Sequence, residues 1–283
     1  MTRLTTQLKN EKLPNSASPK FYLETAHSSP TRKTFQTWNA LSTHWRTGLI
    51  DRASLINKRF KKPVYVQNKN YPLSNFPLCG NFNEPRIHSI SNLEILDLKQ
   101  NAHDLILLSP YLQWTHDVPG MLFQAYQALA EGGFFAACFF GQNTLYEFKS
   151  ICAEIDLDHN KGLEQRFIPT IHTKDAAMLI QRAGFSCPTA DIEHLTFNIS
   201  SVKNLIIKLR NSNFNKNNFS TNDKRPLPRN FLNLANQLYK DQFSDLDQSL
   251  KVSVDLIFIC GWKEKKQTQF AKTAAKSPIT DFK

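Results

Sequence analysis

The sequence lacks several features that mark common protein classes. No apolar run approaches the roughly 20 residues that a membrane span needs, and the first residues lack the apolar core of a secretory signal. The five cysteines include no CxxC pair, which argues against a zinc site and a disulfide framework. Cys138 and Cys260 lie inside apolar stretches, where we expect buried thiols in a reducing compartment. The chain is therefore expected to be a soluble or peripheral protein without a membrane span or a metal site.

Glycine is missing from one part of the chain. None occurs between Gly48 and Gly80. Glycine readily adopts positive φ, and its missing Cβ lets a backbone approach a ligand closely. The absence excludes a glycine-rich ligand-binding turn from this segment.

Positive charge is in excess, with 35 Lys and Arg against 24 Asp and Glu and a formal net charge of +11. This excess could attract nucleic acid, acidic protein or anionic lipid, or could be spread over a solvated surface. The basic clusters are short and carry no interleaved aromatic residues for base stacking. They are Lys58-Arg59 with Lys61-Lys62, and Lys263 with Lys265-Lys266. We therefore do not expect specific nucleic-acid binding.

The apolar pattern predicts an α/β domain. Hydrophobic residues make up 41% of the chain, enough for one large domain or two small ones. Residues 132 and 133, both glycine, are expected to end a helix and turn the chain into a strand. The predicted strands are 63–67, 86–90, 104–108, 134–140, 185–191 and 252–262, and the predicted helices lie within 35–60, 121–129, 143–155, 173–183, 200–210 and 231–243.

Composition also suggests how the chain is organised. Residues 1–34 are rich in Ser, Thr, Pro and Lys and are expected to form a disordered tail, as are the polar residues 267–283. The domain itself would span 35–266. Within it, the Asn-, Ser- and Lys-rich segment 211–229 is expected to be a mobile loop.

Four pieces of sequence carry a family resemblance. They are SPYLQW at Ser109–Trp114 with the following DVP, FGQNTLYE at Phe140–Glu147, AGF at Ala183–Phe185, and GWK at Gly261–Lys263. In order and spacing they resemble class I S-adenosylmethionine (SAM) methyltransferases. The resemblance is to the subgroup of bacterial malonyl-acyl-carrier-protein (malonyl-ACP) O-methyltransferases and of methyltransferase-like arginine hydroxylases that assist assembly of respiratory complex I. The TLYE and GWK pieces are closer to the second group.

The resemblance implies a class I methyltransferase-like (Rossmann-like) fold. Its sheet would be mostly parallel with an antiparallel last strand. Only about 40 residues separate the first predicted strand from the strand at 104, and a βαβ crossover alone takes roughly 30. The front half is therefore expected to be shortened.

The resemblance also implies SAM as cofactor and suggests where it would bind. In the family a glycine-rich turn follows the first strand, and Gln67 and Asn68 stand there in this chain. The family's Ala-Asp pair aligns with Ser91 and Asn92. These departures predict impaired SAM binding. The implied cofactor-binding residues are Gln67, Asn68, Asn92, Leu93, Ser109, Gln113 and Trp114.

Several side chains have two interpretations. Trp114 either lines a ligand pocket or packs against a helix. Tyr146 and Glu147 would contact the substrate at the carboxyl edge of the sheet, although Glu147 could equally lie on a solvated helix face. The sequence shows no Ser/His/Asp or Cys/His arrangement, so no catalytic residue is assigned.

Two functional hypotheses follow. One is a SAM-dependent enzyme that resembles the hydroxylases and methyltransferases above. The other is a catalytically inactive pseudoenzyme that serves as an assembly or binding factor. In either case the expected partner is a protein, either a respiratory-complex subunit or an acyl carrier protein, whose acidic surface would suit the positive charge. The expected location is the cytoplasm, with the mitochondrial matrix as the alternative.

Overall fold

A computed structural model describes most of the chain. The described helices and strands all belong to the unit that spans Arg32–Lys283. The described residues are 33–35, 39–69, 83–92, 94–110, 112–160, 163, 166–167, 169–211, 228–243 and 249–265.

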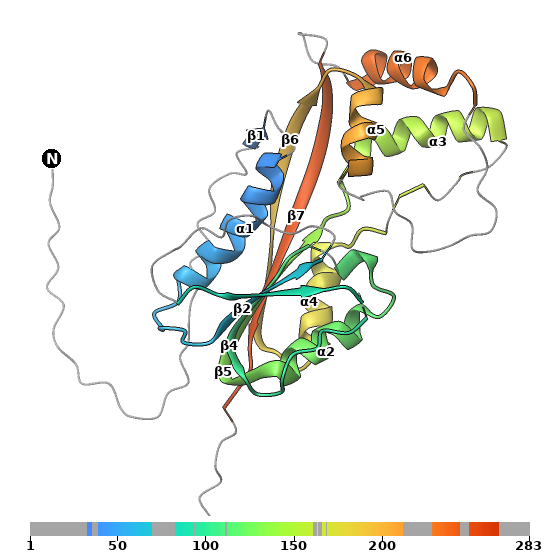
Figure 1. Cartoon of the computed structure of the whole chain (residues 1–283). Coiled ribbons are helices and arrows are strands. Elements are labelled where there is room, and N and C mark those ends of the chain that lie inside the picture. Colours follow the sequence, from blue (N-terminus) through green and yellow to red (C-terminus); the bar gives the residue numbers. More distant parts are fainter. Residues whose placement is uncertain are drawn as a thin grey trace, which may run out of the picture. The chain divides into compact units, whose positions relative to one another are not determined.

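The described strands form one sheet in the order β1-β6-β7-β5-β4-β2-β3 (Figure 1). β7 is antiparallel to both β5 and β6, whereas all the other pairings are parallel. This confirms the predicted α/β fold with a mostly parallel sheet and an antiparallel last strand. The strands are β1 Lys33–Phe35, β2 Pro63–Asn68, β3 Arg86–Ile90, β4 His103–Leu108, β5 Leu129–Phe140, β6 Ser186–Ile199 and β7 Leu250–Trp262.

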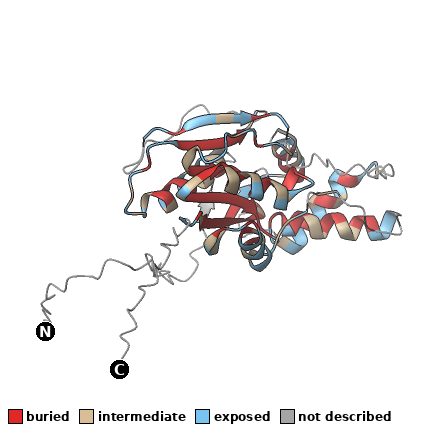
Figure 2. Ribbon diagram, turned by 90° about the horizontal axis from the view of Figure 1, so that it is seen from below, coloured by how far each residue is buried: buried red, intermediate tan, exposed pale blue. Residues whose placement is uncertain are grey.

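The front of the sheet is short, as the sequence predicted. β3 pairs directly with β2, and β2 pairs directly with β4. Between β2 and β4, the described residues contain no strand other than β3 and no helix. The central strands are buried along most of their length, which explains their continuous apolar runs (Figure 2).

The helices lie on both faces of the sheet. They are α1 Asn39–Ser54, α2 Val118–Ala128, α3 Tyr146–Asn160, α4 Thr173–Arg182, α5 Val202–Asn211 and α6 Phe231–Phe243, with a short 3₁₀ helix at Leu112–Trp114. Among the described residues, no helix has the length and the apolar character that crossing a bilayer requires.

Close backbone contacts show which face each helix covers. A Cβ on Gly48 of α1 would lie 2.6 Å from Phe258 Cζ, so α1 packs directly on that ring. A Cβ on Gly261 would lie 3.2 Å from Ile180 Cδ1 of α4. Because Phe258 and Gly261 are an odd number of residues apart in β7, α1 and α4 cover opposite faces. Both glycines are required by close packing.

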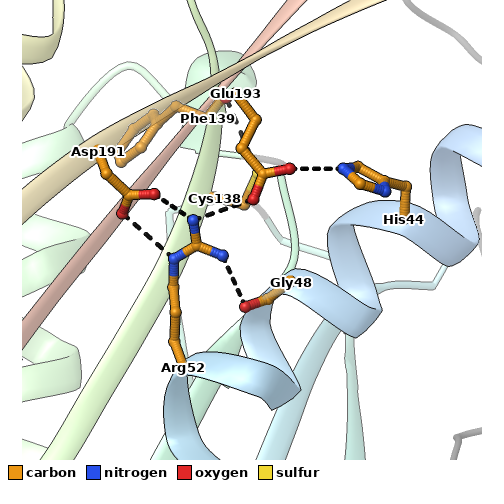
Figure 3. Close-up of polar contacts among 7 residues, drawn as sticks. All are labelled: His44, Gly48, Arg52, Cys138, Phe139, Asp191 and Glu193. Atoms are coloured by element: carbon orange, nitrogen blue, oxygen red, sulfur yellow. Dashed lines mark hydrogen bonds and ion pairs between the residues drawn. The ribbon is translucent and has the colours of Figure 1, made fainter. Parts of the chain in front are cut away.

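An ionic cluster holds α1 to β6 (Figure 3). Arg52 pairs with both carboxylate oxygens of Asp191 and, at 3.1 Å, with Glu193 Oε1. His44 Nε2 lies 2.6 Å from the other oxygen of Glu193. The guanidinium also stacks 3.6 Å from the centroid of the Phe258 ring. These contacts fix α1 over the antiparallel part of the sheet.

The predicted turn at Gly132-Gly133 is wrong. Helix α2 ends earlier, at Ala128, and β5 begins at Leu129, which is already extended. Leu129 pairs with His103 at the start of β4, so sheet hydrogen bonding begins directly after the helix. Gly132 then adopts a φ of 69° inside β5, where its N–H donates to the carbonyl of Lys263 at 2.7 Å. The glycines therefore serve a strand irregularity and do not end the helix.

The predicted domain boundaries meet the structure at a few points. β1 lies at residues 33–35, so a short strand occupies the end of the expected tail and the start of the domain. Asn211, the first residue of the expected mobile loop, ends α5. Most of that loop, residues 1–32 and residues 267–283 lie outside the described part of the chain, so these boundaries stay predictions.

The closing GWK sequence has a structural role at the end of α2. The Lys263 ammonium donates to the carbonyl of Leu129 and to Asn101 Oδ1, both at 2.8 Å, and lies 4.9 Å from the centroid of the Tyr126 ring. Replacing Lys263 by methionine is expected to lower the free energy of unfolding by about 2 kcal/mol, because these acceptors lose a charged donor. Urea unfolding measures the change. The exposed Lys265→Met is the control, and an equal effect of both substitutions would contradict this role.

Candidate functional site

The carboxyl ends of β2, β3, β4 and β5 meet at one edge of the sheet because these strands are parallel. In open α/β sheets, ligands bind outside this edge. Leu93 lies outside the described residues. The structure places the other predicted site residues at or directly after these strand ends: Gln67, Asn68, Asn92, Ser109, Gln113, Trp114, Tyr146 and Glu147.

The end of β2 remains part of the sheet. Gln67 is only 4% exposed, and its Nε2 donates to Ser89 Oγ of β3 at 3.1 Å. Asn68 still pairs with Ile90, and the Lys69 N–H donates to the carbonyl of Ile90 at 2.8 Å. The chain therefore continues along β3 at the place where the resemblance puts a glycine-rich turn.

The segment after β4 contains a buried acceptor. Ser109 N–H donates to the carbonyl of Val66 at 3.0 Å and joins the ends of β4 and β2. Gln113 is buried, and its Nε2 donates to the carbonyl of Pro110 at 3.1 Å. Its Oε1 has no hydrogen-bond partner among the described residues. An unpaired buried acceptor costs about 1–3 kcal/mol, so a ligand donor placed here would be stabilised.

Trp114 packs against the end of β5. Its ring meets Phe140 edge to face, with 6.4 Å between centroids, and Trp45 of α1 meets the same phenylalanine at 6.2 Å. Aromatic pairs at such distances are favourable beyond the area that they bury. The packing interpretation of Trp114 therefore has support, and its role in a pocket stays a prediction.

Glu94 organises the loops of this edge and was missed from the sequence. Its carboxylate accepts hydrogen bonds from Thr115 Oγ1 at 2.6 Å and from His116 N–H at 2.8 Å. Its own N–H donates to Asn92 Oδ1 at 2.9 Å, as in an Asx turn. Desolvation acts to raise the pKa of Glu94, but these hydrogen bonds outweigh it and lower the pKa. Asn92 was a visible signal of this turn, but nothing in the sequence joins Glu94 to residues 115–117.

Tyr146 and Glu147 point to different surroundings. Glu147 is 4% exposed and accepts from the N–H and Oγ of Ser253 in β7, at 2.9 and 2.5 Å. It therefore does not lie on a solvated helix face. Tyr146 is 54% exposed, with its ring 6.0 Å from that of Phe243. A substrate would reach Tyr146 before Glu147, and a substrate-binding role for either stays a prediction.

A second polar group at this edge was also missed. His194 Nδ1 of β6 lies 2.7 Å from Asp255 Oδ1 of β7. Asp255 Oδ2 accepts from the N–H of Asn143, just past β5, at 3.3 Å. Lys149 of α3 lies nearby, and desolvation lowers its pKa to about 8 although the charge of Asp255 acts to raise it. Finding this group needs the register that pairs His194 with Asp255, which the sequence does not reveal.

The described residues contain no group of three or more His, Cys, Asp or Glu side chains that could hold a metal ion. The groups available at the edge are hydrogen-bonding amides, hydroxyls and carboxylates, together with one histidine and one lysine. Such groups can bind a polar ligand and hold or move a proton.

No family model matches the chain. The solved structure of the YcgJ protein from Bacillus subtilis superposes with a TM-score of 0.45 at 10% identity, covering 78% of this chain and 99% of that chain. A superposition this partial says nothing about what the chain binds.

Curated proteins give a firmer comparison. The mitochondrial arginine-hydroxylase NDUFAF5 of Danio rerio is 29% identical over 170 residues, which cover 60% of this chain and 52% of that protein. The human protein of the same name is 27% identical over 63% of this chain and 51% of its own length. A malonyl-[acyl-carrier protein] O-methyltransferase of Gallionella capsiferriformans is 27% identical over 42% of this chain and 39% of its own.

The chain thus spans about half the length of the curated hydroxylases that it matches. The same two groups were indicated by the SPYLQW, FGQNTLYE, AGF and GWK sequences. The recognition made from those motifs is confirmed: the chain is a homologue of the NDUFAF5 arginine hydroxylases and of the malonyl-ACP O-methyltransferases.

Proposed function

We propose that this chain is a methyltransferase-like protein that acts in the assembly of a respiratory complex and binds SAM poorly or not at all. Its hydroxylase relatives are named as mitochondrial proteins, which favours the mitochondrial matrix over the cytoplasm. Its partner is then a respiratory-complex subunit.

The end of β2 is the observation that carries the proposal. A glycine turn leaves room for a ligand because its backbone has no Cβ and can adopt positive φ. Here the buried Gln67 side chain, bonded to Ser89, fills that position. Lys69 remains bonded to Ile90, so the backbone does not turn away to form a cradle. These residues do not fit SAM as the family holds it, and we derive no reaction step through it.

One feature supports the enzymatic alternative. The unpaired Oε1 of Gln113 lies at the edge where the family binds its cofactor, and it could accept from an amino group of a ligand. In that alternative, the remaining cofactor contacts would come from Asn68, Asn92, Ser109 and Trp114. The substrate would be a respiratory-complex subunit or an acyl carrier protein.

Gene deletion followed by complementation tests the proposal. Deleting the gene in its source organism is expected to lower the amount of assembled respiratory complex I. Reintroducing either the natural chain or Gln113→Ala should restore assembly fully, because the cofactor contact is not used. Unchanged complex I after deletion would exclude the assembly role. Rescue by the natural chain but not by an equally abundant Gln113→Ala variant would instead favour the enzymatic alternative.

A further inference from the structure

His194 and Asp255 lie at the carboxyl edge, beyond the end of β5. Phe140, the last residue of β5, pairs with Leu256 of β7, so Asp255 is the first β7 residue past the end of β5. Asp255 shares its face of the sheet with Ser253, two residues away, and Ser253 contacts Glu147 of α3. The pair therefore lies on the α3 face of the sheet, near the start of that helix (Figure 1).

Asp255 fixes the orientation of the His194 ring. Asp255 is 2% exposed, and its oxygens are engaged by His194 Nδ1 and by the N–H of Asn143. A carboxylate only accepts, so Nδ1 must carry the proton. In the neutral ring Nε2 is then an acceptor. The side chain of His194 is 32% exposed, and Nε2 has no hydrogen-bond partner among the described residues.

Lys149 supplies a donor on the other side of the same carboxylate. It follows Glu147 on α3 and interacts with the charge of Asp255. Its ammonium has no hydrogen-bond partner in the part of the chain that the structure describes. Glu147 is already bonded to Ser253 and does not compete for it. A cationic ligand would be repelled by Lys149, and an anionic one by Asp255.

We propose that His194 and Lys149 form a binding site for a neutral group that both donates and accepts hydrogen bonds, namely a primary amide or a hydroxyl. The group donates to His194 Nε2 and accepts from Lys149 Nζ, while Asp255 holds the ring in place. Such a group occurs on the side chains of a polypeptide and on small molecules. The site lies outside the β2–β4 region discussed for SAM and does not depend on SAM binding.

Protection from chemical labelling tests this site, with acetamide as the probe. Diethyl pyrocarbonate acylates a neutral imidazole nitrogen, and mass spectrometry of the full chain's peptides follows each histidine separately. Acetamide is expected to slow the labelling of His194 at least about twofold through occupancy of the site, and to leave the exposed His172 unchanged. Equal effects on both histidines, or no effect on His194, would overturn the proposal.

Two variants and a second probe sharpen the test. Lys149→Met should leave His194 reactive but abolish its protection by acetamide, and retained protection would overturn the proposal. Asp255→Asn keeps an acceptor for Asn143 but releases the ring from its fixed tautomer, so protection should weaken. The tripeptide Gly-Gln-Gly supplies the same amide on a peptide backbone. Stronger protection by the tripeptide than by acetamide would assign a polypeptide ligand, and equal protection would assign a small molecule.

Discussion

Replacing Glu147 by alanine is expected to lower the free energy of unfolding by about 3 kcal/mol, one of the largest effects of any single substitution at this edge. The carboxylate is buried and accepts from both the N–H and the Oγ of Ser253. Its removal takes a charged acceptor from two buried donors and detaches the first turn of α3 from β7. Glu147→Gln keeps one acceptor oxygen and should cost about half as much.

The neighbouring tyrosine provides a matched control for Glu147. Tyr146 lies one residue earlier on the same helix but is 54% exposed. Tyr146→Ala should change the free energy of unfolding by less than about 1 kcal/mol in the same urea titration. If Glu147→Ala were equally mild, Glu147 would not be the structural anchor described above, and its substrate-binding role would gain support.

Replacing Glu193 by glutamine is expected to remove about 2 kcal/mol of stability near pH 7, and the loss should shrink in acid. Desolvation acts to raise the pKa of Glu193, but the hydrogen bond from His44 and the charge of Arg52 outweigh it and bring the pKa to about 2. The ordinary value is 4.5. A carboxyl group with a lowered pKa stabilises the fold fully above its unfolded pKa. That contribution is lost as the pH falls from about 4.5 towards 2.

Urea unfolding of the natural chain and of Glu193→Gln at a series of pH values measures this difference. The two curves of stability against pH should be well separated at about pH 7 and converge near pH 2. Asp241→Asn, on the exposed part of α6, should run parallel to the natural chain throughout. A separation between the natural chain and Glu193→Gln that stays constant down to about pH 2 would show that the ionic cluster does not hold α1 through the charge of Glu193.

The fold was largely predictable because its strands and helices carry strong periodic patterns. The apolar run Leu105–Leu108 predicted a buried parallel strand, and the strand at Arg86–Ile90 and the helix at Phe231–Phe243 were placed at their observed boundaries. The turn at Gly132-Gly133 was misjudged because a glycine pair looks the same in a helix end and in a strand irregularity. Only the pairing of Leu129 with His103 distinguishes them, and that is a tertiary contact.

The candidate site was predictable in location but not in detail. Residues that follow parallel strands share one edge, so Gln67, Ser109 and Gln113 were found from topology alone. The contacts of Glu147 with Ser253 and of His194 with Asp255 depend on strand register, which a single sequence does not fix. Both pairs join residues more than 60 positions apart in the chain.

Isothermal titration of the purified chain with SAM, and with S-adenosylhomocysteine beside it, tests the central claim most directly. Because Gln67 and the pairing of Lys69 with Ile90 fill the place of the glycine turn, no saturable binding of either ligand is expected up to about 1 mM. A dissociation constant in the micromolar range for either ligand would contradict the account.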